Sequence, residues 1–189
     1  FKLHRLAEGE ALLLDALARL GADRGFSMTL GTIYSDQFRY DESKERYLES
    51  IADAEREGAK IFSAVAHYNL SILESRHYKY AEAFARTIAS LEAAERASGH
   101  LAKGELHLRR LEFPMAFAEY QAAYQVDSSP LSKINLAQAY QMAGRLEEAR
   151  AYGEETLAAR DLSWMLNYGT DEERHRRDLH EILATTYSG

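Results

Sequence analysis

Apolar residues recur along most of this chain with the spacing of three and four residues that lets a helix bury one face. Near the N-terminus such a stripe is formed by Leu3, Leu6, Leu13, Leu17 and Leu20, which predicts an amphipathic helix within residues 1–22. The chain has only 2 prolines and few β-branched residues, so little in it opposes helices. The pattern therefore predicts an all-α fold.

A short pattern recurs four times between residues 23 and 160. It consists of an apolar residue, a small residue directly after it, an aromatic residue, and then a second small residue. The clearest copy has Leu136, Ala137, Tyr140 and Ala149 at these positions. The second small residue of the successive copies is Ser43, Ala83, Ala116 and Ala149, which gives spacings of 40, 33 and 33 residues. About seven residues are therefore inserted after the first copy, and we expect them within 53–60, where they lengthen a helix or its connection.

Each copy predicts a pair of helices. Pro130 suits the opening turn of the first helix in the last pair, and Pro114 suits the start of the second helix in the third pair, because the fixed φ of proline fits a first helical turn. Gly144 is expected to end a helix. On this basis the four pairs occupy approximately residues 23–57, 62–96, 97–128 and 130–160.

The two ends of the chain are expected to cover the open apolar faces of the stacked pairs. The N-terminal cover is the helix within 1–22, and the C-terminal one lies in 161–189. There, Thr170 and Glu173 resemble a capping box that opens a helix. Its apolar stripe is formed by Leu179, Ile182, Leu183 and Tyr187.

These copies resemble the tetratricopeptide repeat (TPR), a helix–turn–helix unit of 34 residues with small and aromatic residues at fixed positions. The second copy departs from the pattern because Glu74 replaces the aromatic residue, and the third departs at Lys103 and His107. The resemblance implies a right-handed superhelical array of antiparallel helix pairs, with flanking helices at both ends. Small residues would let the paired helices approach closely, at Gly31, Ser71, Gly104 and Ala137. Aromatic residues would fill the gaps between pairs, at Tyr34, Tyr40, Tyr80, Phe113 and Tyr140.

The resemblance also implies a concave groove, lined by the first helices of the pairs, that receives a peptide or protein segment. In the first copy the matching positions are Met28, Thr32, Ser35 and Asp36. In the later copies, the residues that we expect to line this groove are Tyr68, Asn69, Ile72, Arg76, Glu105, Leu108, Arg109, Ile134, Asn135, Gln138 and Met142.

Two kinds of polar residue in this set have a possible role in recognition. Asn69 and Asn135 can both donate and accept hydrogen bonds, which suits a ligand backbone, and the alternative is that they are surface amides bonded to a neighbouring helix. Arg76 and Arg109 can anchor an acidic group, and the alternative is that they form weak surface ion pairs. The first copy lacks the Lys and Asn of the clamp by which some family members hold a C-terminal carboxylate, so we do not expect that clamp.

Composition narrows the function further. The net charge is −7, which argues against a nucleic-acid partner, and the absence of cysteine excludes disulfides and zinc–thiolate sites. No apolar run is long enough to insert into a membrane. The histidines form no recognisable metal set, and no motif of a nucleophile or a phosphate-binding loop occurs, so we expect neither a metal, a cofactor nor an enzyme. We predict a soluble chain, and the choice among cytoplasm, periplasm and export stays open, with the cytoplasm favoured.

The leading functional hypothesis is a non-catalytic protein-binding module with its groove as the binding site. Two alternatives stay open. One is a self-assembly scaffold that dimerises through its terminal helices, and the other is a peptide-sensing regulatory domain of a larger protein.

Overall fold

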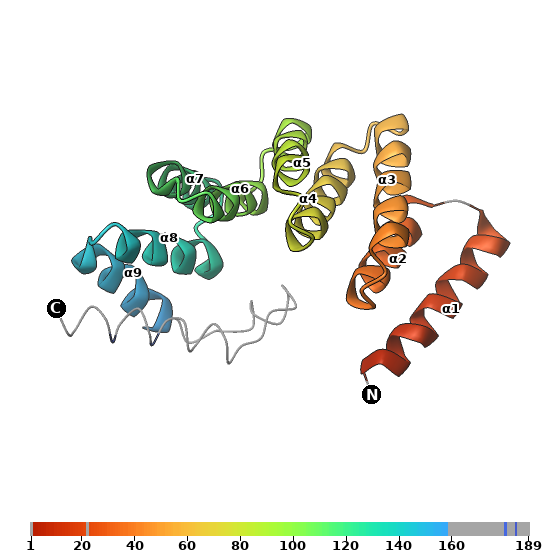
Figure 1. Ribbon diagram of the computed structural model, residues 1–189, viewed down its shortest axis with the longest axis horizontal. Coiled ribbons are helices and arrows are strands. Elements are labelled where there is room, and N and C mark those ends of the chain that lie inside the picture. Colours follow the sequence, from red (N-terminus) through yellow and green to blue (C-terminus); the bar gives the residue numbers. More distant parts are fainter. Residues whose placement is uncertain (1, 22, 159–179, 181–183, 185–189) are drawn as a thin grey trace. The chain divides into compact units, whose positions relative to one another are not determined.

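The computed structural model describes residues 2–21, 23–158, 180 and 184 (Figure 1). Every element within the described residues is an α-helix, as the apolar spacing predicts. The expected C-terminal cover at 161–189, with Thr170 and Glu173, lies outside the described residues apart from two isolated positions. None of the described helices is both long and apolar enough to cross a membrane.

The chain divides into two units, each described here by itself. The first unit, residues 1–95, contains α1 (Lys2–Leu20), α2 (Arg24–Asp36), α3 (Tyr40–Arg56), α4 (Lys60–Arg76) and α5 (Tyr80–Ala93). The second unit, residues 96–189, contains α6 (Ala97–Arg109), α7 (Phe113–Val126), α8 (Pro130–Met142) and α9 (Leu146–Ala158). Helices that follow one another in the chain pack together within each unit, which gives the pairs α2–α3, α4–α5, α6–α7 and α8–α9.

Small residues allow the helices of a pair to approach closely. A Cβ placed on Gly31 of α2 would lie 2.7 Å from the ring of Tyr47 in α3. In the second unit, a Cβ on Gly104 of α6 would lie 2.7 Å from the ring of Tyr120 in α7. Any larger residue at these two positions would push the paired helix away, which is the steric reason for the small residue in the repeat pattern. In the first pair the Ser43 hydroxyl adds a buried hydrogen bond of 2.7 Å to the carbonyl oxygen of Gly31.

The longer first spacing has its explanation in helix length. Helices α3 and α4 each have 17 residues, whereas α5 and α7 have 14, and α6 and α8 have 13. The connection between α3 and α4 is the short segment 57–59, like the other connections between pairs. The extra residues therefore lengthen two consecutive helices and leave the turns unchanged.

Helix α1 covers the outer face of α2, with Leu6, Leu13 and Leu17 packed against a buried cluster that contains Leu30, Ile33 and Tyr34. The sequence stripe also included Leu20, and this was wrong, because Leu20 is 77% exposed. It is the last residue of the helix and is not among the leucines that pack against this cluster.

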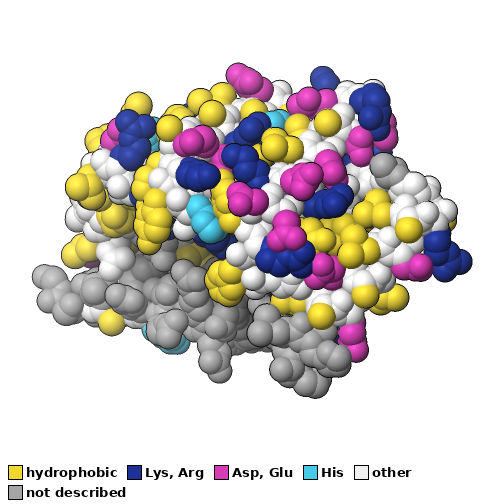
Figure 2. All heavy atoms as spheres, turned by 45° about the vertical axis from the view of Figure 1, so that its right-hand side comes forward, with side chains coloured by type: hydrophobic (Ala, Val, Ile, Leu, Met, Phe, Trp, Pro, Cys, Tyr) yellow, Lys and Arg dark blue, Asp and Glu magenta, His cyan; other side chains and the backbone are white. Residues whose placement is uncertain are grey.

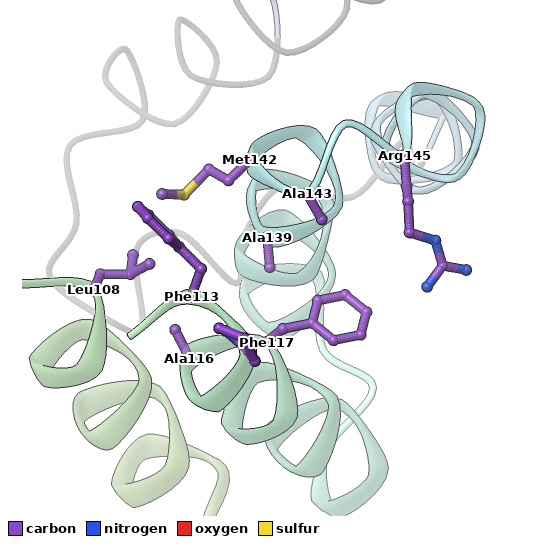
Figure 3. A pocket seen from close by; sticks show the side chains of 9 residues that line it. Leu108, Phe113, Ala116, Phe117, Ala139, Met142, Ala143 and Arg145 are labelled. Carbon is purple, nitrogen blue, oxygen red and sulfur yellow. The ribbon is translucent and has the colours of Figure 1, made fainter. Parts of the chain in front are cut away.

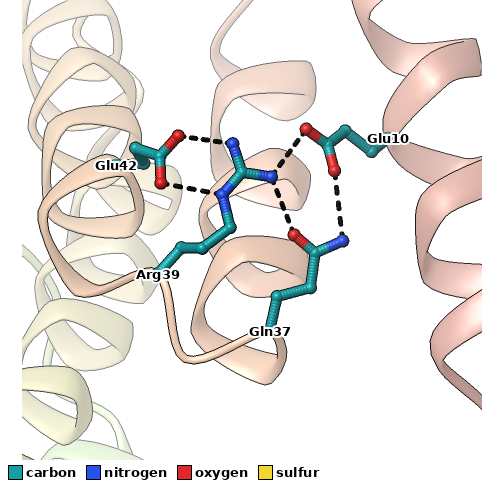
Figure 4. A network of polar contacts seen from close by, with 4 residues as sticks. All are labelled: Glu10, Gln37, Arg39 and Glu42. Atoms are coloured by element: carbon teal, nitrogen blue, oxygen red, sulfur yellow. Dashed lines mark hydrogen bonds and ion pairs between the residues drawn. The ribbon is translucent and has the colours of Figure 1, made fainter.

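A polar network fixes α1 to the turn between α2 and α3 (Figure 4). The Arg39 guanidinium donates to the carboxylate of Glu10 at 2.7 Å and to the side-chain oxygen of Gln37 at 2.9 Å, and it also pairs with Glu42. Gln37 in turn donates to Glu10 at 3.1 Å. The hydrogen bond from Arg39 holds the pKa of the Glu10 carboxyl below its usual value. One arginine thus joins three helices.

In the second unit, a comparable contact joins α6 to α7. The carboxylate of Glu119 lies 2.7 Å from Nδ1 of His100 and accepts a hydrogen bond of 2.6 Å from Lys103. Burial alone raises the pKa of Glu119, but these two contacts outweigh it and hold the pKa below the usual value. Nearby, His107 is buried and pairs with Glu112 at 2.6 Å. These histidines have packing roles between helices.

The turn inside each pair has the same conformation in every copy. Its central residue has a positive φ: 62° at Phe38, 60° at Tyr78, 59° at Leu111 and 73° at Gly144. Glycine adopts this region without strain, whereas a residue with a Cβ does not. The three non-glycine residues are also among the most exposed apolar side chains of the described chain.

Candidate binding surface

In the first unit a small polar pocket of about 190 Å³ lies among α2, α3 and α4. Its lining combines hydroxyl, amide, charged and aromatic groups. The residues are Thr32, Ser35, Asp36, Tyr47, Tyr68, Asn69, Ile72 and Arg76.

Helical periodicity explains how these side chains come together. On α4, Tyr68, Ile72 and Arg76 are spaced by four residues, so they lie along one face of the helix. Thr32 and Ser35 lie three apart on α2, and Tyr47 of α3 also lines the pocket, with its hydroxyl 3.2 Å from that of Thr32. The pocket is thus built by the first helices of two successive pairs and one residue from the helix between them.

The electrostatic character of this pocket is mixed. Burial raises the pKa of the Tyr68 and Tyr47 hydroxyls, and the positive charge of Arg76 opposes this shift at both. Arg76 and Asp36 are the last residues of α4 and α2, so one cation and one anion line the same pocket. Such a set of groups can donate to and accept from a polypeptide backbone while an aromatic ring contacts its side chains. Within the described residues, no group of three or more metal-binding side chains is clustered.

In the second unit a larger pocket of about 360 Å³ lies between α7 and α8 (Figure 3). It is almost entirely apolar. The residues around it are Leu108, Phe113, Pro114, Ala116, Phe117, Ala139, Met142, Ala143 and Arg145. Figure 3 shows Phe113 and Met142 approaching each other at one side and the small side chains of Ala116 and Ala139 between the two helices.

Arg145 is the charged residue of this lining. Its guanidinium lies 4.6 Å from the ring centroid of Tyr140, and it donates two hydrogen bonds, of 3.0 and 2.6 Å, to Glu148. The hydrogen bonds to Glu148 raise the pKa of Arg145, so it is always charged. A guanidinium has five N–H groups, so donors remain for a further acceptor.

Comparison with known proteins shows which proteins share this fold. The tetratricopeptide repeat profile matches residues 131–160, which contain most of α8 and all of α9. A search of curated protein sequences finds no significant match. Several solved structures share the fold at low sequence identity, and three of them show its extent.

A thermophilic TPR protein of Thermus thermophilus is 22% identical, with a TM-score of 0.64, and the match covers 89% of this chain and 91% of that one. BtubC of P. vanneervenii is 20% identical, with a TM-score of 0.68, over 80% of this chain and 72% of its own. A TPR protein of Parabacteroides merdae is 17% identical, with a TM-score of 0.64, over 97% and 70%. Residues 131–160 thus match a tetratricopeptide repeat, and the chain shares the fold of tetratricopeptide repeat proteins. Its fold is an all-α TPR-like array of helix pairs, as the resemblance implied.

The repeats place the expected groove residues of the first unit together. Tyr68, Asn69, Ile72 and Arg76 all line the polar pocket, and Thr32, Ser35 and Asp36 face them from α2. Of these, Tyr68, Asn69 and Ile72 are half-buried and Arg76 is exposed. Met28 packs instead against a buried cluster of the unit.

The expected groove residues of the second unit do not form one pocket. Leu108 and Met142 line the apolar pocket, while Glu105 and Arg109 form an exposed ion pair of 3.0 Å along α6. Gln138 is half-buried. Ile134 is 2% exposed, so its side chain belongs to the core and cannot contact a ligand in this structure.

The two asparagines differ in their surroundings. Asn135 donates a hydrogen bond of 2.8 Å to the carbonyl oxygen of Leu131, one turn earlier in its own helix. One of the N–H donors of its side chain is therefore occupied. This is close to the alternative of a helix-surface amide that bonds to protein backbone, although the acceptor lies in the same helix and not in a neighbouring one. Asn69 lines the polar pocket of the first unit.

Sequence reasoning missed Phe113 as a surface residue. We expected it to fill the space between helix pairs, but it is 46% exposed and borders the apolar pocket. A signal in the sequence is Ala139, which also lines this pocket and is small at a position where the other repeats have a large residue.

Charges on the described surface are interspersed. Figure 2 shows Lys and Arg side chains beside Asp and Glu side chains over the visible face. Many are near neighbours on one helix, such as Arg46 with Glu49 at 2.8 Å and Arg56 with Asp53 at 2.6 Å. Exposed pairs of this kind contribute little stability, and they leave this face without a field of one sign.

Proposed function

We propose that this protein is a non-catalytic module that binds a peptide or protein segment along the first helices of its repeats. The fold itself supports a role in protein–protein interaction or scaffolding. The observation that carries the finer proposal is the polar pocket of the first unit, where Tyr68, Asn69 and Arg76 of α4 face Thr32 and Asp36 of α2. The proposal includes four repeats, at about 23–57, 62–96, 97–128 and 130–160.

Each group in this pocket has a distinct part in the proposal. The amide of Asn69 pairs with a backbone group of the bound segment, because an amide both donates and accepts. The ring of Tyr68 contacts an apolar side chain, since tyrosine buries a large area with few rotatable bonds. Arg76 and Asp36 bind groups of opposite charge and so set the direction of the segment.

The test is a double variant, Tyr68→Ala with Arg76→Ala. Peptides are first selected from a displayed random library against the full chain, and their affinities are then measured by calorimetry. We expect the double variant to bind them about tenfold or more weakly, because an aromatic and an arginine anchor are lost together. The melting temperature should change little, since Arg76 is exposed and Tyr68 is half-buried.

The matched control is Arg56→Ala with Tyr124→Ala. This pair also removes one exposed arginine and one half-buried tyrosine, but neither residue lines the polar pocket. Its affinity should match that of the unaltered chain. Equal binding by the pocket variant and the control would reject the assignment of this pocket.

A second candidate function is self-assembly, and α1 favours it. Its inner face packs on α2, but Leu12 on another face is 72% exposed and Leu20 at its end is 77% exposed. A helix with apolar side chains outside its packed stripe has surface to bury against a partner. A dimer through this helix is the form of assembly that we propose.

A further inference from the structure

Ala139, which lines the apolar pocket of the second unit, is smaller than the residue at the same position of each other repeat. Counted back by the repeat spacing, Ala139 corresponds to Leu106, Leu73 and Ile33 of the earlier repeats. All four positions are buried, and the other three have larger apolar side chains. Only methyl groups project there from Ala139 and Ala116, and a pocket of about 360 Å³ remains above them (Figure 3).

Such a pocket is unfavourable for the isolated fold. Atoms that line an unfilled apolar space lose dispersion contacts on that side, and the loss grows with its volume. The other repeats of this same chain show that a larger side chain is compatible with the position. The vacancy is thus a local departure from the chain's own pattern, of the kind expected at a functional site.

Two of the large side chains that line the pocket are apolar and exposed to solvent. Phe113 is 46% exposed and Met142 is 50% exposed, and both line the pocket. Leu111 and Met115, two positions before and after Phe113 in the sequence, are 73% and 57% exposed, although neither lines the pocket. Leu111 also has a φ of 59°, a conformation that costs a leucine energy and returns no burial. Exposed apolar residues therefore occur both in the pocket lining and next to it in the sequence, which favours a polypeptide as the occupant over a small molecule.

Charge and size narrow the chemistry of the occupant. The residues that line the pocket include one cation, Arg145, and no carboxylate. A dry apolar cavity of about 150 Å³ holds a benzene ring, so the space here admits the side chain of a leucine, phenylalanine or tryptophan. Unbranched methionine at the mouth adapts its shape to such a guest.

We propose that this pocket holds one large apolar side chain of a partner polypeptide, and that a carboxylate close to it in the partner binds Arg145. The inference rests on the proposed function, because it names what one part of the binding surface holds. It places an anchor in the second unit, separate from the polar pocket of the first.

The experiment fills the pocket from inside with Ala139→Leu, which restores the residue type of the other repeats. Peptides are selected from a displayed random library against the full chain, and the affinity of each synthetic peptide is measured. We expect the selected peptides to contain a leucine or an aromatic residue with an acidic residue nearby. Their binding to Ala139→Leu should be about ten- to a hundredfold weaker, which corresponds to the burial of one such side chain.

The matched control is Ala118→Leu, which adds the same atoms at an exposed position of α7 outside the pocket. It should bind as the unaltered chain does. Ala139→Leu should melt at the same temperature or higher, because it fills unoccupied space. If it fails to fold, Met142→Lys tests the same point from the exposed mouth, and it should weaken the binding by a similar factor.

The outcomes separate this inference from the proposed function. Peptides that lose affinity for Ala139→Leu but bind Tyr68→Ala/Arg76→Ala normally support the anchor and reject the polar pocket as the site. Peptides with the reverse behaviour overturn the anchor and leave the proposed function standing. A selection without an apolar anchor, or one that yields no peptide, also overturns the anchor. Arg145→Gln tests the proposed contact between Arg145 and a carboxylate of the partner. Unchanged affinity of this variant for acidic peptides would reject that contact.

Discussion

At the scale of single residues, Gly31 and Gly104 determine how closely the helices of their pairs approach each other. Gly31 and Gly104 were expected to be small because their helices pack closely, and the rings of Tyr47 and Tyr120 would lie 2.7 Å from a Cβ at these positions. That prediction depended on size at a fixed position, which a sequence displays directly. Exposure depends on neighbours from other helices, and there Phe113 and Ile134 were placed wrongly.

The turn inside each repeat yields a prediction at this scale. Replacing Phe38 by glycine should raise the free energy of unfolding by about 0.5–1.5 kcal/mol, because the left-handed conformation is strained for phenylalanine and free of strain for glycine. Little burial is lost, since Phe38 is 87% exposed. Urea denaturation measures the change.

Two variants control this prediction. Phe38→Ala keeps the Cβ and hence the strain, so it should not gain the stability of Phe38→Gly. Gly144→Ala introduces the same strain at a φ of 73° and should lose about 1 kcal/mol. A chain that is no more stable with glycine at 38 would mean that the phenylalanine has stabilising contacts of its own.

At the scale of elements, the repeat spacing predicted helix pairs. The structure shows which helices contain the additional residues between the first and second copies of the pattern. The residues expected within 53–60 lengthen α3 and α4, and the connection at 57–59 stays short. The sequence left open whether a helix or a connection is lengthened, because periodicity alone does not locate the end of a helix to within a few residues.

The contact between α3 and α4 contains a buried charge at the point where the repeat pattern fails. Glu74 stands where the other pairs have Tyr34, His107 or Tyr140, and it is fully buried. Its carboxylate oxygens lack hydrogen-bond partners, and Lys44 of α3 lies 3.3 Å away as its counter-ion. The pair joins two neighbouring repeats.

Removing the cation should therefore destabilise this contact. Lys44→Met is expected to lower the free energy of unfolding by about 1–3 kcal/mol, because it leaves a buried carboxylate without its counter-ion. The cost stays below that of a fully buried pair, since the Lys44 side chain is 31% exposed. Urea denaturation again gives the value.

The double variant Lys44→Met with Glu74→Leu is the informative comparison. Replacing both charges with apolar groups is often neutral or stabilising, so the double variant should recover most or all of the loss. If the single Lys44 variant loses nothing, the ion pair has no part in holding the repeats together.

At the scale of the whole molecule, the open question is what covers the exposed apolar positions. If the chain assembles through α1, Leu12→Lys with Leu20→Lys should convert a dimer to a monomer in light scattering, because charged side chains at these exposed positions oppose burial. The control is Ala11→Lys with Ala18→Lys, two other exposed positions on the same helix. A monomer at every concentration before any substitution would remove self-assembly from consideration.

The sequence by itself determined that the chain is helical, that its helices form pairs with a regular spacing, and where the pairs must pack closely. These properties follow from periodicity and side-chain size, which act between residues near in the chain or at fixed offsets. The tertiary structure decided which positions of each repeat face solvent. The repeat pattern gave the same prediction for the same position of every repeat. At one such position Leu106 and Leu73 are large and buried, whereas Ala139 is small and lines a pocket. That difference arises from helices that meet only in the fold, and it is where the candidate anchor lies.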